Sequence, residues 1–290
     1  MQKFLRVFDG KLYEAGQTQK LGFEKSEGLR IPDEYLDDRE FTILRTAWGI
    51  GDWGIISAMP RLLKEKYPDS KVYVPSKKFI KNTFGIDSDM MNVVFKNNPY
   101  VDEFKDEIVG EIFHDHYRIY DNTNENVPLV EQMLKFWQFE DKEYTDSQPE
   151  LYWSDDEIEL GNKIIEKYVG SDEFGCLLVS DRFGTQYGKY DEDSYQNDKQ
   201  KIEKLLKDNE LPYFYWTHKP LRETEFSFIN SALDMRNINL RIQLYIKSKA
   251  KINLANQCGV NHSIVRYSEC YESQRQFPIS HNYISGVNYI

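Results

Sequence analysis

The chain has 290 residues, of which 40% are hydrophobic and 14% aromatic, and its formal net charge is −11. This length allows one large or two medium domains, and the apolar share can supply their cores. The acidic balance argues against a general nucleic-acid binder, which needs a clustered basic face that the short basic runs 77–81 and 247–251 do not provide.

The cysteines and the apolar runs bear on the compartment. Three cysteines, an odd number without metal-ligand spacing, indicate reduced thiols. No apolar run approaches the roughly 18 residues that span a membrane. We therefore expect a soluble, cytoplasmic protein with at most peripheral membrane contact.

The first 40 residues are atypical of the rest. Residues 4–8, an Asp9-Gly10 turn and residues 11–13 predict a β-hairpin. A polar stretch follows to about residue 36, and its glycine and proline residues disfavour regular helices and strands. We expect residues 1–40 to form an N-terminal extension, with a disordered arm as the alternative.

The stretch 41–68 predicts a strand, a tight loop and a helix. An apolar run (41–44) is followed by a glycine-punctuated loop (46–51) and an amphipathic segment (53–67). Asp52 stands where the loop becomes the helix. Its carboxylate can cap the first turn or face a substrate at the carboxyl edge of a sheet. The sequence leaves both roles open.

Strands and helices alternate through the rest of the first half. The expected strands are 71–74, 93–95, 101–104 and 111–113, and the expected helices are 76–83 and 128–139. Such alternation is typical of a mostly parallel sheet covered on both faces.

The second half repeats the alternation after a boundary expected between 141 and 154. Ser154 and Glu157 have the spacing of a capping box, which opens a helix to about 169. The remaining strands are expected at 175–180, 213–217 and 251–255, the helices at 194–206, 226–233 and 240–248, and a loop at 257–262. The predicted fold is α/β, with two Rossmann-like domains (41–148 and 149–290) facing across a cleft.

Several motifs resemble those of the heptosyltransferase-like glycosyltransferases of family nine, which have the GT-B fold. In the first half they are Arg45, Gly51-Asp52, Pro60, Leu63-Lys64, Pro68 and the turn Asn98-Pro99-Tyr100-Val101-Asp102-Glu103. In the second half, residues 180–189 occupy the place of the family's donor loop "HPG…K". Residues 257–262 occupy the place of its "D-S/T-G-x-x-H" motif.

The resemblance implies an inverting, metal-independent transfer of a sugar from a nucleotide-sugar donor to a glycan or lipid-linked acceptor. No cofactor is expected besides the nucleotide sugar, which is a co-substrate. Such a reaction needs a base for the acceptor hydroxyl and positive charge for the departing diphosphate. Residues 41–148 would then be the acceptor-side domain and residues 149–290 the donor domain.

The resemblance and the residues themselves together suggest site residues. Asp52 is the candidate catalytic base. The candidate acceptor-side residues are Arg45, Gly51, Trp53, His114 and His116. The candidate donor-binding residues are Arg182, Thr185, Gln186, Lys189, Gly259 and His262.

Each assignment has a structural alternative. Arg45 can pair with an acidic neighbour, and His262 can cap a helix. Lys189 and Arg182 can lie on an exposed loop. Trp48 and Trp53 can pack the glycine loop instead of stacking on a sugar, and packing is the favoured role.

Two patterns mimic metal sites. His114 and His116 share a face of a strand, but no further ligand set accompanies them. The patterns at 87–89 and 191–193 match the DxD motif of metal-dependent glycosyltransferases, and in a chain with 48 acidic residues such matches arise by chance. We expect no metal site.

Two other functions remain open. Gln257 stands where the family has an acidic residue, which favours a non-catalytic nucleotide- or glycan-binding relative. The other alternative is a sugar-nucleotide epimerase on the same scaffold.

Overall fold

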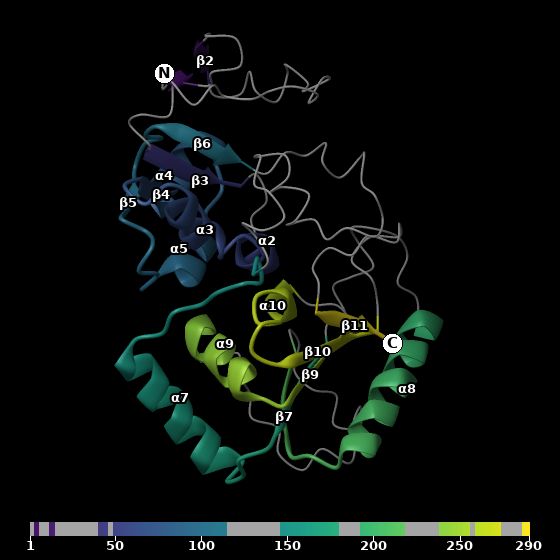
Figure 1. Cartoon of the computed structure of the whole chain (residues 1–290). Coiled ribbons are helices and arrows are strands. Elements are labelled where there is room, and N and C mark those ends of the chain that lie inside the picture. Colours follow the sequence, from purple (N-terminus) through teal and green to yellow (C-terminus); the bar gives the residue numbers. More distant parts are fainter. Residues whose placement is uncertain are drawn as a thin grey trace. The chain divides into compact units, whose positions relative to one another are not determined.

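The computed structural model describes residues 3–5, 12–14, 40–45, 49–114, 146–179, 192–217, 238–255, 259–273 and 286–290. The chain divides into two compact units, Met1–Ser147 and Gln148–Ile290 (Figure 1). This division falls inside the 141–154 segment where the sequence placed the boundary. The predicted helices 128–139 and 226–233 lie outside the described residues.

The first unit contains a four-stranded parallel sheet. Its strands are β3 (Glu40–Leu44), β4 (Lys71–Pro75), β5 (Glu103–Lys105) and β6 (Glu111–His114), in the order β5-β4-β3-β6. The chain steps outward from β3 to β4 and β5, then returns to the other side of β3 for β6. The order therefore reverses between β3 and β6, which is the switch point at which open α/β sheets bind ligands.

A separate pair of short strands precedes this sheet. β1 (Lys3–Leu5) pairs antiparallel with β2 (Leu12–Glu14), with Phe4 opposite Tyr13. The predicted Asp9-Gly10 turn lies outside the described residues.

The predicted single helix 53–67 is wrong, because two helices occupy this stretch. They are α2 (Ile50–Gly54) and α3 (Met59–Lys66), separated by a turn. Pro60 lies at the start of α3. Proline lacks a backbone N–H and its ring clashes with the preceding turn, so it suits a helix start and not a helix interior.

The strand predicted at 93–95 is also wrong. Residues Met90–Phe95 form a helix, α5, which follows α4 (Lys77–Phe84). Met91, Val94 and Phe95 are its buried residues, at the i, i+3, i+4 spacing of a helix. A three-residue apolar run is too short to distinguish the two periods.

The segment NPYVDE forms a structural turn before β5. The Asn98 side chain accepts a hydrogen bond from the Tyr100 N–H at 2.9 Å. The Asp102 carboxylate then accepts from the Val72 N–H at 2.8 Å and from Lys71 Nζ at 3.2 Å, and it lies 2.8 Å from Lys64 Nζ. One carboxylate thus joins α3, β4 and the entry to β5.

Replacing Asp102 with asparagine is expected to lower the free energy of unfolding by about 1–3 kcal/mol at neutral pH. Burial on its own would raise the pKa of Asp102, but the bonds from Lys64, Val72 and Lys71 together lower it below its usual value. A lowered pKa stabilises the fold above the unfolded-state value of about 4. The difference between Asp102→Asn and wild type should therefore shrink as the pH falls below about 4, as measured by urea unfolding. A pH-independent difference would contradict this.

The second unit contains a five-stranded parallel sheet. Its strands are β7 (Gly175–Val179), β8 (Tyr213–Thr217), β9 (Ile252–Ala255), β10 (Glu269–Glu272) and β11 (Val287–Tyr289), in the order β11-β10-β9-β7-β8. The chain goes from β7 to β8 on one side and returns to β9 on the other. Its switch point therefore lies between β7 and β9.

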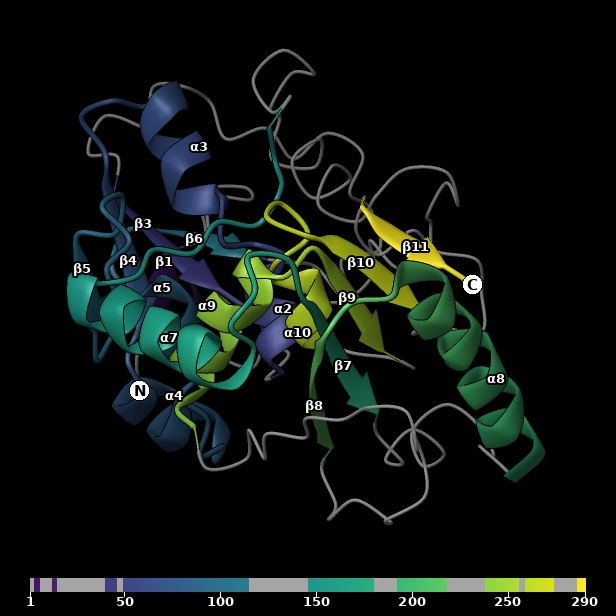
Figure 2. The same ribbon diagram turned by 90° about the horizontal axis from the view of Figure 1, so that it is seen from below.

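Helices cover both faces of this sheet (Figure 2). One core cluster joins Cys176, Leu178 and Phe214 to α9 (Leu240–Lys249), with residues of α7 (Asp155–Tyr168) packed against it. The other joins alternate strand residues to Ile202 and Leu206 of α8 (Glu192–Asn209). Burial on both faces explains why these strands are continuous apolar runs.

The loop predicted at 257–262 is wrong for its second part, because Gly259–His262 form a short helix, α10. The predicted capping box is confirmed. The Ser154 hydroxyl accepts from the Glu157 N–H at 3.3 Å, and the Glu157 carboxylate accepts from the Ser154 N–H at 3.0 Å.

A buried ion pair ties α7 to α9. Arg241 donates through Nε to one oxygen of Glu157 at 2.6 Å and through Nη2 to the other at 2.8 Å. The same Nη2 donates to the Tyr152 carbonyl. Beside this pair, Gly161 of α7 lies so close to the Tyr245 ring that a Cβ there would stand 2.2 Å from a ring carbon. The two helices therefore pack at close range.

Cys176 and Cys270 are buried free thiols, and burial raises the pKa of Cys176 to about 12. Cys176 is therefore protonated, and burial shields both thiols from thiol reagents in the folded protein. None of the helices in the described ranges combines the length and apolar character that a membrane crossing requires.

Candidate functional site

Asp52 lies in the first turn of α2. Gly49 is the N-cap residue, and its N–H donates to Asp52 Oδ2 at 3.0 Å. Asp52 is therefore the third residue of the helix, and its carboxylate caps the first turn by accepting from the N-cap N–H, which is one of the two roles that the sequence left open. Its position still suits an anion, because the free N–H groups of a helix start favour negative charge.

Arg45 supplies a second partner for this carboxylate. It follows β3 directly, its side chain is fully buried, and its Nη2 lies 3.5 Å from Asp52 Oδ1. A guanidinium removed from water needs a counter-ion, so the pairing alternative for Arg45 is confirmed. The Asp52 side chain keeps 22% of its surface exposed. It is thus held from two sides and remains accessible.

The switch point of the first sheet brings two acceptor-side candidates, Arg45 and His114, to one edge. Leu44, the last residue of β3, pairs with His114, the last residue of β6. Arg45 and His114 therefore stand at the carboxyl ends of neighbouring strands. The His114 side chain, His116 and Trp48 lie outside what the structure describes.

Trp53 points into the core. It is fully buried, and its ring meets Phe95 edge to face at a centroid distance of 6.2 Å. This is the packing role that the sequence favoured. Gly51 is likewise a buried residue of α2. Among the described side chains of the five acceptor-side candidates, that of Arg45 contacts the Asp52 carboxylate.

The donor-side candidates follow the two strands that flank the second switch point. Residues 180–191 come directly after β7, and α10 comes shortly after β9. Leu178 and Ala255, near the ends of these strands, are paired in register. The side chains of Arg182, Thr185, Gln186 and Lys189 lie outside the described residues, so their roles stay predictions.

His262 has an interior partner. Its Nε2 lies 3.4 Å from Glu272 Oε2 of β10, and both side chains are fully buried. Gly259 begins α10 and is partly buried. Glu272 could not be singled out from the sequence, because it follows the stretch covered by the motifs and its contact with His262 forms only in the folded unit.

The candidate metal patterns gain no support from the described residues. Within them, no group of three or more histidine, cysteine, aspartate or glutamate side chains is arranged to hold a metal ion. Asp87 of the first DxD match instead pairs with Lys77 at 3.0 Å and Lys81 at 3.8 Å. Asp191 of the second match lies outside the described residues.

Comparisons with family models and with curated protein sequences each found no match. Among solved structures, the chain is similar to a glycosyl transferase of family 9 from Veillonella parvula DSM 2008. The TM-score is 0.53 and the identity 9%, over 88% of this chain and 86% of that one.

Two E. coli structures are more distant. They are ADP-heptose lps heptosyltransferase II (TM-score 0.42, 10% identity, 87% of this chain and 90% of that one) and heptosyltransferase WaaC with ADP (0.38, 9%, 78% and 83%). Of these three structures, the Veillonella one is similar enough to show the fold. The chain therefore has the α/β fold of a family 9 glycosyl transferase.

Proposed function

We propose that the protein is an inverting, metal-independent glycosyltransferase that moves a sugar from a nucleotide-sugar donor to a glycan or lipid-linked acceptor. The observation that carries the proposal is the Asp52 carboxylate at the carboxyl edge of the first sheet. It is oriented by the Gly49 N–H and by buried Arg45, and it is still partly exposed. The shared fold with the Veillonella protein supports the same class of enzyme.

In this proposal Asp52 is the general base. One carboxylate oxygen accepts the proton of the acceptor hydroxyl while that hydroxyl oxygen attacks the anomeric carbon. The bond from the anomeric carbon to the diphosphate oxygen breaks on the opposite face, so the configuration inverts. Because Arg45 and Gly49 fix the carboxylate in advance, the base needs no reorganisation during the reaction.

The donor diphosphate is assigned to the second unit. Topology supports this, because the segments that follow β7 and β9 come after the two strands that flank the switch point, where such sheets bind ligands. Lys189, Arg182, Thr185 and Gln186 on the first segment would stabilise the leaving diphosphate, and Gly259 would admit its close approach.

Titration calorimetry against ADP, GDP, UDP and dTDP tests this proposal. We expect at least one diphosphate to bind, and Lys189→Ala to weaken that binding by about tenfold or more, as loss of a charge-assisted contact should. Lys163→Ala, which removes an exposed lysine paired with Glu159, is the matched control. The transferase proposal fails if none of the four diphosphates binds.

A non-catalytic nucleotide- or glycan-binding protein is the second candidate. The burial of His262 against Glu272 favours it, because a histidine engaged inside the unit is less available to a ligand. Gln257 in place of an acidic residue points the same way. Diphosphate binding without turnover of any nucleotide sugar would establish this function.

A further inference from the structure

Asn261 of α10 is a buried polar residue whose side chain is left unsatisfied. The residue is fully buried, and in the part of the chain that the structure describes neither its amide nitrogen nor its amide oxygen has a hydrogen-bond partner. A buried amide without partners destabilises the fold, because it has given up its hydrogen bonds to water. Folded proteins pair nearly all such groups, so this side chain needs an explanation.

The backbone of Asn261 is well held, so the unsatisfied amide does not come from a loose segment. Its carbonyl accepts from the Ile264 N–H at 3.0 Å, and the Cys270 thiol of β10 donates to the same carbonyl at 3.7 Å. The next residue, His262, meets Glu272 of β10 at 3.4 Å. These contacts fix α10 against β10 on both sides of the Asn261 side chain.

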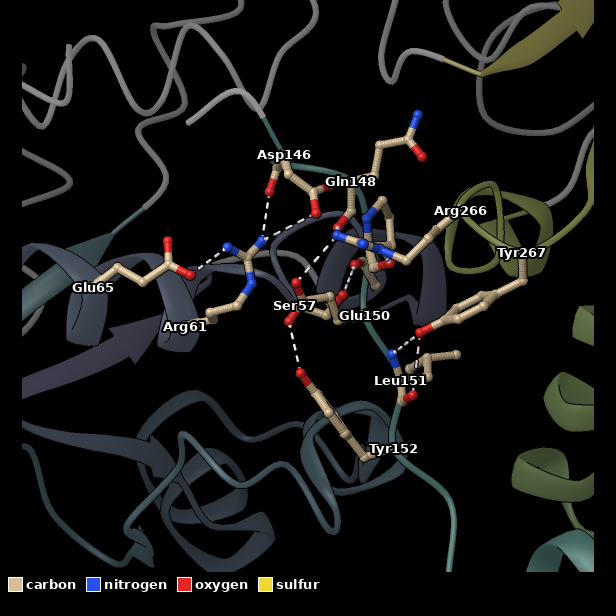
Figure 3. Close-up of polar contacts among 12 residues, drawn as sticks. Ser57, Arg61, Glu65, Asp146, Gln148, Glu150, Leu151, Tyr152, Arg266 and Tyr267 are labelled. Carbon is tan, nitrogen blue, oxygen red and sulfur yellow. Dashed lines mark hydrogen bonds and ion pairs between the residues drawn. The ribbon is translucent and has the colours of Figure 1, made fainter. Parts of the chain in front are cut away.

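The turn after α10 is attached to the start of the same unit. Arg266 Nε donates to the Pro149 carbonyl at 3.0 Å, and the Tyr267 hydroxyl accepts from the Leu151 N–H at 2.8 Å (Figure 3). Both contacts lie within the second unit. The segment that carries Asn261 is therefore held at its far end as well.

Asn253 of β9 shows how an asparagine with a structural role is bonded in this unit. It is also fully buried, and its Nδ2 donates to Ser268 Oγ at 2.6 Å and to the Lys247 carbonyl at 3.0 Å. These bonds connect β9 to the end of α9 and to the residue before β10. The Asn261 amide makes no such bond to any described residue, so internal packing does not explain why an amide stands there.

The position of α10 in the fold indicates what the amide meets. This helix follows β9, one of the two strands that flank the switch point of the second sheet, where open α/β sheets bind ligands. A carboxamide has both donors and an acceptor, and so does a hydroxyl group. Phosphate oxygens at neutral pH accept only, so a diphosphate would leave the Asn261 oxygen unsatisfied.

We propose that Asn261 binds a sugar hydroxyl of the nucleotide-sugar donor. This inference rests on the proposed function and adds a residue to its donor site. The hydroxyl belongs either to the ribose or to the transferred sugar. Since the amide is buried in the absence of a ligand, the atoms that cover it must move aside on binding, as side chains at binding sites commonly do.

Asn261→Leu tests the inference first in the ligand-free protein. Leucine has a similar size, and no hydrogen bond of the described residues to this side chain is lost, so the urea midpoint of unfolding should stay unchanged or rise. Asn253→Leu, a matched change of a buried asparagine in the same unit, removes two hydrogen bonds and should lower the midpoint. Hydrogen exchange of the β-strand amides checks that each variant is folded.

Titration calorimetry then measures ligand binding. The ligands are ADP, GDP, UDP and dTDP and the matching nucleotide-glucose compounds. Asn261→Leu should weaken binding by about tenfold, the usual effect of losing one well-formed hydrogen bond, and Asn253→Leu should not. A loss with the diphosphates assigns the ribose, and a loss confined to the glucose compounds assigns the transferred sugar. Asn261→Ala should give the same loss, and it carries the test if the leucine variant does not fold.

Two results would overturn the inference. One is wild-type affinity of the Asn261 variants for both sets of ligands. The other is a fall in the midpoint of Asn261→Leu as large as that of Asn253→Leu, because the amide would then be satisfied inside the protein by water. Either result, with ligand binding by the wild type intact, refutes this assignment alone. Absence of wild-type binding to every compound refutes the proposed function with it.

Discussion

Asp52→Asn is expected to lower kcat for sugar transfer by about 10²–10⁴-fold, the usual contribution of a general base. The asparagine oxygen can still accept the Gly49 N–H, so the start of α2 is preserved, but an amide cannot take up the acceptor proton. Nucleoside diphosphate affinity should stay within about twofold, since that ligand is assigned to the second unit. Turnover of the donor and calorimetric affinity for the nucleoside diphosphate are measured on the same protein.

Two companion variants sharpen the result. Gly49→Ala would place a Cβ 2.7 Å from Asp52 Oδ2, so the carboxylate must shift while remaining ionisable. This variant should lose turnover although no acidic group is removed. Asp69→Asn, an exposed aspartate in the same unit, is the matched control. If Asp52→Asn lowers the free energy of unfolding, because buried Arg45 loses its counter-ion, but leaves turnover unchanged, Asp52 is structural and not a base.

Arg241→Met is expected to have the largest effect on stability, about 3–5 kcal/mol in the free energy of unfolding of the second unit. The substitution leaves the Glu157 carboxylate, whose side chain is only 12% exposed, without its partner. It also removes the donor to the Tyr152 carbonyl. Urea-dependent hydrogen exchange of the α7 and α9 amides measures the loss where it arises.

The exposed ion pair between Glu159 and Lys163 of α7 provides the control for this experiment. Lys163→Met breaks an exposed Glu159–Lys163 ion pair on the same helix and should cost less than about 1 kcal/mol. Arg241→Met combined with Glu157→Met should recover part of the loss, because an apolar pair leaves no buried charge. Equal losses for Arg241→Met and Lys163→Met would show that the buried pair contributes no more than a surface contact.

The regular elements were predictable where the sequence signal is local. The apolar runs of β3, β4, β7 and β8 are confirmed at nearly their predicted bounds, since strands buried on both faces must be apolar throughout. The Ser154 cap is confirmed because a cap depends on residues within one turn.

The failures come from signals that are short or ambiguous. The break between α2 and α3 was missed, because the amphipathic pattern continues across it and only Pro60 marks the new start. Residues 93–95 and 259–262 are too few to reveal a period, so tertiary packing decides their conformation.

For the side-chain contacts, too, local patterns were predictable and long-range contacts were not. Asp52 was found because Gly-Asp at a strand–helix junction is a local pattern with a chemical meaning. The partners of Arg266 and Arg241 were not, because those contacts join positions more than 80 residues apart in the chain. Nothing in the neighbouring sequence of either arginine indicates which carboxylate or carbonyl it will meet.

The burial of Arg45 affects how active relatives of this fold are recognised. A lineage that lost turnover would still need an anion beside this guanidinium, because a buried cation without a counter-ion destabilises the unit. The aspartate would then persist under selection for folding alone. Its presence therefore cannot distinguish an enzyme from a descendant that only binds, and that distinction rests with the residues that hold the donor.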